Sequence, residues 1–127
     1  MKNIKEKLSR MLSPDQPKRE VRFDGSGFTI LDGKKEPVIG SWAMVKEVFA
    51  FKQDRITFDD ICIGFRFSNA GSYWWVAEDY VGFEDLHQEV KRIFPGINQN
   101  WMAEVATPPF SENRTTLWGE KWEPTRT

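Results

Sequence analysis

The chain has 127 residues, of which 39% are hydrophobic and 29% are charged, and its formal net charge is −1. This length and composition suit one folded domain with its own core, and they exclude a disordered chain. No run of 18 or more apolar residues occurs, so the sequence predicts no membrane-spanning helix.

The first 17 residues form a predicted N-terminal helix and linker. Apolar residues recur at helical spacing in NIKEKLSRML (3–12), and Pro14 and Pro17 then end the helix. The segment lacks the continuous apolar stretch and the cleavage site of a secretory signal, and Cys62 is the only cysteine, so we expect a cytoplasmic protein. An alternative is peripheral association of this basic, amphipathic helix with an anionic membrane; its three turns bury little area, which favours packing on its own sheet.

Three short strands are predicted next, over 21–23, 28–31 and 37–39. The turns DGSG and DGKK separate them, and Asp-Gly between apolar runs is typical of hairpins. The following segment, WAMVKEVFAFKQD (42–54), fits a helix or a strand by its apolar spacing, and its hairpin neighbours favour a strand. The three short strands predict an antiparallel meander.

The segment DICIGFRF (60–67) shows the clearest alternation in the chain. One face is apolar and the other is small or polar, with Ile61, Ile63, Phe65 and Phe67 on the first and Cys62, Gly64, Arg66 and Ser68 on the second. A turn at SNAG then leads to Trp74 and Trp75, which must point to opposite faces of the next strand. We expect one of them in the core and the other on the polar face with Arg66, covered either by the tail or by a partner.

The segment GFEDLHQEVKRIFPG (82–96) carries the signals of an amphipathic helix. Acidic residues open it, basic residues close it, Pro95 and Gly96 stop it, and its apolar stripe consists of Phe83, Leu86, Val90, Ile93 and Phe94. The tail, 97–127, is predicted to be an extended aromatic segment that folds back over the sheet, with TTLWGE as a candidate strand.

This element order predicts an α+β fold: one antiparallel, strongly bent sheet of six to seven strands, a capping C-terminal amphipathic helix and a short N-terminal helix. The expected organisation is a helix and linker over 1–17, sheet and capping helix over 18–96, and an aromatic tail over 97–127 that packs on the same domain. The runs GSWAMVKEVFAFKQD, FDDICIGFRF and VGFEDLHQEVKRIFPG, with the later Trp101, resemble small, largely uncharacterised bacterial proteins with a pleckstrin-homology-like fold.

The resemblance covers roughly 28–118 and implies a scaffold that binds rather than catalyses. Some proteins of this kind resemble immunity proteins, which neutralise a toxin. Lipid-binding pleckstrin-homology domains use a basic loop between the first strands, whereas DGSG here is not basic, so the sequence argues against phosphoinositide binding.

The sequence offers few groups for catalysis or metal binding. His87 is the only histidine, and we expect it to be exposed or half-exposed on the flank of the helix. Cys62 between two isoleucines is expected to be a packed thiol. The chain has too few soft ligands for zinc, no phosphate-binding glycine loop and no nucleophile elbow. We therefore predict no catalytic residue, no cofactor and no metal.

Acidic residues concentrate in the middle of the chain, where residues 54 to 89 contain eight acidic residues and only two basic ones, both arginines. Such a region is unsuited to nucleic acid and suited to a cationic partner, although acids can also merely solvate loops. A second hypothesis, of an enzyme or a ligand- or divalent-cation-binding protein, requires four acids to meet at one sheet edge: Asp59, Asp60, Glu78 and Asp79. They could equally be turn and helix-cap acids.

Six tryptophans are too many for one small core, so some are expected to lie at the surface. Large aromatic residues that remain exposed are typical anchors of protein interfaces. Our first hypothesis is therefore a non-catalytic protein-binding module, with immunity-like character implied by the resemblance. Its candidate partner-binding residues are Trp74, Trp75, Arg66, Glu78, Asp79 and Trp101.

Overall fold

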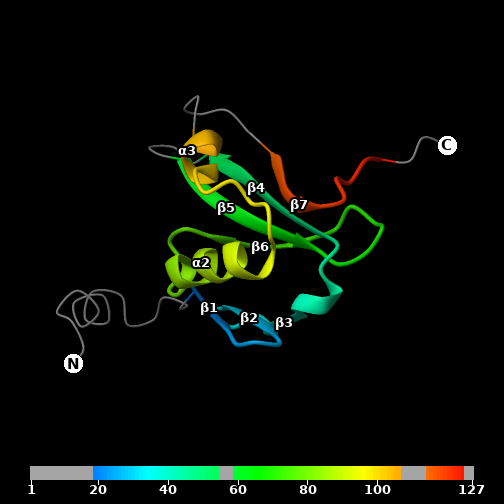
Figure 1. Ribbon diagram of the computed structural model, residues 1–127. Helices are drawn as coiled ribbons and strands as arrows, with labels where there is room; N and C mark the ends of the chain where they lie inside the picture. The colour runs from blue at the N-terminus through cyan, green and yellow to red at the C-terminus, as the bar shows by residue number, and fades with distance from the viewer. Residues whose placement is uncertain (1–18, 55–58, 107–113, 125–127) are drawn as a thin grey trace.

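A computed structural model describes residues 19–54, 59–106 and 114–124 of the chain. The N-terminal helix predicted over 1–17 lies outside these residues. The described chain is an α+β fold with two antiparallel sheets (Figure 1). The three-stranded sheet has the order β1 (Arg19–Phe23), β2 (Gly27–Asp32), β3 (Val38–Ser41). These three strands confirm the predicted meander.

The four-stranded sheet has the order β6-β5-β4-β7, so the strand from the tail lies beside β4. Its members are β4 (Glu47–Asp54), β5 (Asp59–Arg66), β6 (Trp74–Ala77) and β7 (Thr115–Gly119). The ambiguous segment 42–54 is thus mostly strand, after one 3-10 turn, η1 (Trp42–Met44). A single bent sheet of six to seven strands was predicted, but the seven described strands are divided between two sheets because β4 pairs with β5 and β7, not with β3.

Two helices accompany the sheets. The predicted amphipathic helix is α2 (Phe83–Ile93), and α3 (Trp101–Ala106) replaces the extended conformation expected for the start of the tail. The turn before α3 is closed by Asn98, whose Oδ1 accepts the amide of Asn100 at 2.8 Å. At the other end, Nζ of Lys52 donates to the carbonyl of Ala106 at 3.1 Å and ties α3 to β4. No helix in the described ranges is long and apolar enough to cross a membrane.

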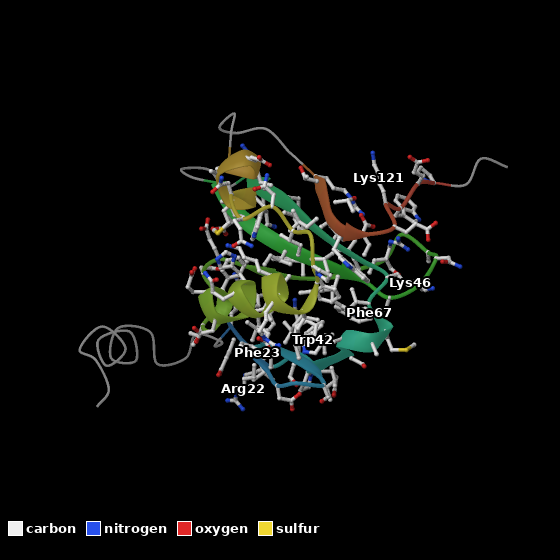
Figure 2. All side chains as sticks on the ribbon, in the orientation of Figure 1. Arg22, Phe23, Trp42, Lys46, Phe67 and Lys121 are labelled. Atoms are coloured by element: carbon white, nitrogen blue, oxygen red, sulfur yellow. The ribbon has the colours of Figure 1, made fainter. Side chains whose placement is uncertain are left out.

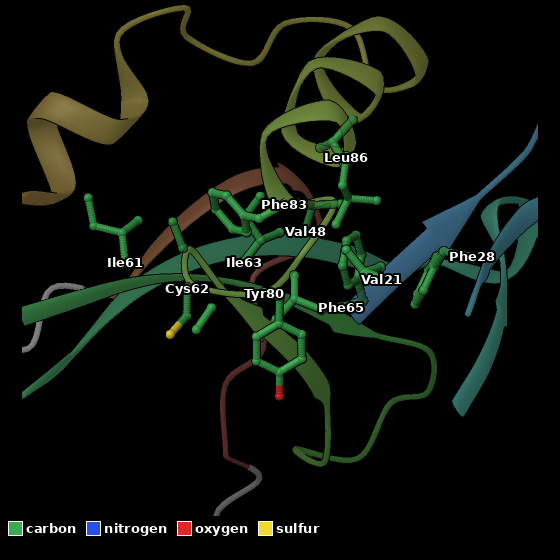
Figure 3. Close-up of a cluster of buried hydrophobic side chains, with 14 of the residues drawn as sticks. Val21, Phe28, Val48, Ile61, Cys62, Ile63, Phe65, Tyr80, Phe83 and Leu86 are labelled. Atoms are coloured by element: carbon green, nitrogen blue, oxygen red, sulfur yellow. The ribbon is translucent and has the colours of Figure 1, made fainter. Parts of the chain in front are cut away.

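The core lies where α2 and the three-stranded sheet cover one face of the four-stranded sheet. Ile61 and Ile63 of β5 point toward Phe83 and Leu86 of α2, whereas Cys62 points the other way (Figure 3). Phe28 of β2 packs against the same face, with its ring centroid 4.6 Å from that of Phe65. The indole of Trp42 lies between the two sheets, 5.0 Å from Phe28 (Figure 2). The alternation predicted for β5 is confirmed on this face.

The opposite face of the four-stranded sheet is also buried, although its sequence is more polar. Cys62, Gly64 and Arg66 are all buried there. The ring of Phe49 fits against Gly64 so closely that a Cβ on the glycine would lie 2.3 Å from it. The C-terminal segment adds further cover, because the ring of Trp122 packs on Gly71 of the β5–β6 loop. Glu47 and Phe49 of β4 lie on this second face too, directly opposite Arg66 and Gly64.

Candidate functional site

The structure separates the three tryptophans predicted to contact a partner. Trp74 lies opposite Phe65 at the start of β6 and is 54% exposed. Trp75 lies opposite Gly64 on the second face, half-buried against Phe51 and Tyr80. Trp101 is buried on α3. Of the six tryptophans, all within the described ranges, Trp74 alone is exposed.

The predicted acids lie at the far end of β6 from Trp74. The carboxylate of Glu78 accepts the backbone amide of Ile61 at 3.0 Å, and Oδ2 of Asp79 lies 3.8 Å from Nη1 of Arg19. At the rise of a β-strand, Trp74 and Glu78 are about 13 Å apart. The exposed tryptophan and these acids therefore belong to different parts of the surface.

Three of the four acids of the second hypothesis have described side chains, and these three do not form a metal site. Asp60 is buried at the start of β5, and the side chain of Asp59 lies outside the described part. Among the described residues, no group of three or more His, Cys, Asp or Glu side chains could hold a metal ion. Glu78 and Asp79 already hold a backbone amide and an arginine, which are structural uses of a carboxylate.

Arg66 belongs to a buried polar network that was not predicted from the sequence. Its Nε donates to Oε1 of Glu47 at 2.9 Å, and its other nitrogens donate to the carbonyls of Ser68 and Glu120. Glu47 and Arg66 are direct cross-strand neighbours, so the correct β4–β5 register would have revealed this opposite-charge pair. Arg66 is therefore a structural residue that anchors the C-terminal segment.

Glu47 accepts further hydrogen bonds from the C-terminal segment. Its donors are Thr116 Oγ1 at 2.6 Å, the Trp122 amide at 3.1 Å and Arg114 Nη2 at 3.3 Å. Burial raises the pKa of Glu47, but the bonds from Thr116, Arg66 and Trp122 and the charge of Arg114 together hold that pKa below its ordinary value. Glu47 is thus a buried carboxylate that stays ionised at neutral pH.

Beside Glu47, two aromatic rings meet at a right angle. The rings of Phe49 and Tyr73 have centroids 4.9 Å apart and planes inclined by 84°. The guanidinium carbon of Arg114 lies 3.7 Å from the Phe49 centroid and 5.7 Å from that of Tyr73. We call the group of Glu47, Phe49 and Tyr73 the aromatic corner.

Tyr73 also lines a small hollow at the surface. The hollow has a volume of about 190 Å³ and is bordered by residues of the β5–β6 loop and by the first residue of β6: Phe67, Ser68, Ser72, Tyr73 and Trp74. We call these five residues the Trp74 surface. Tyr73 is 38% exposed, and it connects this surface to the aromatic corner.

A larger hollow of about 480 Å³ lies at the β1–β2 turn, and its lining has few side chains suited to catalysis or ligand binding. Its lining includes Arg22, Asp24, Phe23 and the exposed Ile39. Oδ1 of Asp24 already accepts the amides of Ser26 and Gly27, which close the turn. The hydroxyl of Ser26 also donates to this oxygen, and that bond, followed by the two amide bonds, lowers the pKa of Asp24. The carboxylate therefore serves the hairpin.

His87 is buried, so the prediction of an exposed or half-exposed side chain was wrong. It is 5% exposed, with its ring stacked on Phe83 and 5.6 Å from the ring of Trp101. The cause is α3, which was predicted to be extended and which covers this flank of α2. Burial is the main cause that lowers the pKa of His87, and the charge of Lys91 adds to it against the opposing effect of Glu84.

Comparison of this chain with family models, with curated proteins and with solved structures gives no match. The arrangement of the residues must therefore carry the functional argument. That arrangement consists of an exposed tryptophan beside a hollow and, next to it, an aromatic corner filled by an arginine.

Proposed function

We propose that this chain is a small, non-catalytic protein-binding module whose partner contacts the Trp74 surface. The observation that carries the proposal is the 54% exposure of Trp74 on β6, a strand at the edge of its sheet. A tryptophan exposed beside a hollow keeps a large apolar area in contact with water, which is unfavourable until a partner covers it. Tryptophan and tyrosine are also the residues that most often dominate binding energy at protein interfaces.

The uses of the titratable groups support binding rather than catalysis. Glu47 is enclosed by four hydrogen-bond donors, and Glu78 holds a backbone amide. His87 packs among aromatic rings. A general acid or base must reach a substrate, and these groups instead stabilise the fold.

We further propose that the scaffold is pleckstrin-homology-like and that the protein acts in the cytoplasm. The proposed pleckstrin-homology-like scaffold is supported by the two antiparallel sheets and by the amphipathic helix packed on their shared core. An immunity-like role, in which the partner is a toxin that this chain neutralises, would fit a module that presents one aromatic anchor on a stable framework.

The test replaces the exposed tryptophan in the full-length protein. Tagged wild type, W74A and I39A are used to capture partners from the native host, with I39A as the control because Ile39 is exposed on the other sheet. We expect one partner that wild type and I39A retain equally and that W74A retains at least about tenfold less, since loss of a hot-spot residue costs about 2 kcal/mol or more. Equal capture by W74A, or capture of no partner by wild type, would contradict the proposal.

A further inference from the structure

The aromatic corner has the composition of a cation-binding site. Two rings at 84° form two walls, and a carboxylate lies beside them. Cations bind over aromatic faces within about 6 Å of the ring centroid, and a nearby carboxylate adds a charge-assisted hydrogen bond. The guanidinium of Arg114 satisfies both conditions, with ring distances of 3.7 and 5.7 Å and a 3.3 Å contact to Glu47.

The two arginines that contact Glu47 are held very differently. Arg66 is 3% exposed and makes three hydrogen bonds, one to Glu47 and two to backbone carbonyls. Arg114 is 34% exposed, and its contact with Glu47 is the longest of the four that this carboxylate accepts. Arg66 is therefore fixed, whereas Arg114 lies at the solvent side of the corner and can be replaced.

Departure of Arg114 would leave the surrounding structure in place. Arg114 immediately precedes β7, whose pairing with β4 begins at Thr115. Glu47 would keep Arg66, Thr116 and the Trp122 amide, so its charge would still be compensated. The vacated space would be bounded by Phe49 and the partly exposed Tyr73.

We propose that the aromatic corner is a guanidinium-binding site, which Arg114 occupies from the same chain and which an arginine side chain of the protein partner occupies in its place. This inference rests on the proposed function, because Tyr73 belongs to both the corner and the Trp74 surface. It names the chemistry of the partner, an arginine placed next to the residue that contacts Trp74. Arg114 then competes with the partner, so the contact is autoinhibitory.

The experiment empties the corner and supplies the missing group. Thermal unfolding of R114A is measured with methylguanidinium and with methylurea, a neutral molecule of similar shape. At about ten times its dissociation constant, methylguanidinium should raise the unfolding midpoint of R114A by about 5 °C, and methylurea should not. Wild type, whose corner is filled, and R92A, whose lost arginine pairs with Glu89 on α2, should show no such rise.

Two further variants keep the test decisive. R114Q removes the charge while it retains a stem and a polar end, and it repeats the titration if R114A does not fold. R114A/Y73A removes one wall of the corner and should lose the shift. Equal shifts with methylguanidinium and methylurea, or no shift in either arginine variant, would show that Arg114 is only structural.

The outcomes separate this inference from the proposed function. The methylguanidinium titration needs no partner, so its failure refutes the guanidinium site and leaves the capture result with W74A untouched. Unchanged capture by W74A refutes the binding module while the titration still reports on the corner. With a captured partner in hand, R114A should bind that partner more tightly than wild type, because the competing side chain is gone.

Discussion

At the scale of single residues, His87 has an environment suited to a neutral ring. Its Nδ1 is buried and has no hydrogen-bond partner among the described residues, and its Nε2 lies 3.1 Å from Nε2 of the Gln88 side chain. Phe83 stacks on the ring from within α2 and Trp101 approaches it from α3. Lys91 disfavours a second positive charge, although Glu84 partly offsets this effect from 3.5 Å. Protonation would therefore place a poorly solvated charge between two packed helices.

We expect the free energy of unfolding to fall as the pH falls below about 6.5, the ordinary pKa of histidine. The folded-state pKa of His87 is lowered, so the unfolded state takes up the proton first and acidification favours unfolding. Urea unfolding at pH 7.5, 6.5 and 5.5 should show this loss in wild type, and H87Q should show a much smaller pH dependence over that interval. An equal slope in both proteins would assign the effect to other groups.

At the scale of elements, the start of α2 is fixed to β1. Gly82 precedes the helix with a φ of +93°, and a Cβ there would lie 2.3 Å from the carbonyl oxygen of Val21. The backbone of Val81 exchanges two hydrogen bonds with β1, from the Val21 amide at 2.9 Å and to the Arg19 carbonyl at 3.0 Å. The helix that covers one sheet is thus attached to the edge of the other.

The variant G82A should destabilise the protein more than G96A. Gly96 has a similar φ of +91° but open space around it, so G96A measures the cost of the left-handed backbone, about 1 kcal/mol. G82A adds the clash with Val21 and should cost about 3 kcal/mol, with the difference read from urea unfolding midpoints. Equal losses of unfolding free energy in the two variants would mean that β1 moves away from the new Cβ without an energetic cost.

At the scale of the whole molecule, the C-terminal segment completes the second face of the four-stranded sheet. It supplies Thr116 and the Trp122 amide to Glu47, and the Glu120 carbonyl to Arg66. These contacts join residues up to 75 positions apart in the chain. On the other face, Trp118 packs on Phe94 with ring centroids 4.6 Å apart, so the same segment also closes the core.

A chain that ends at Ala106 should therefore lose cooperative unfolding. Without the segment, the buried Glu47 loses three of its four hydrogen-bond donors and Arg66 loses one of its three acceptors. The outer edge of β4 is also open, and both losses are costly for buried charges and for a central strand. A chain that ends at Pro124 keeps every contact named above and should unfold like wild type. The measurement is the urea transition followed by tryptophan fluorescence; a cooperative transition in the shorter chain would contradict the expectation.

The sequence by itself determined the elements whose signals are local. The stripe of α2, the alternation of β5 and the Asp-Gly turns around β2 depend on residues a few positions apart, so composition and period were enough to predict them. The same alternation required Trp74 and Trp75 to face opposite ways. A helix that bears Trp101 was read as extended because its six residues carry too little periodic signal.

Only the tertiary structure decided which strands pair and what each face meets. The division into two sheets, the exposure of Trp74, the burial of His87 under α3 and the Glu47–Arg66 pair all depend on register or on contacts between distant segments. Arg114 reaches Glu47 across 67 positions, and nothing local to either residue signals that contact. Short-range periodicity is fixed by backbone geometry, whereas long-range pairing is selected by the packing of the whole chain, and that packing created the aromatic corner.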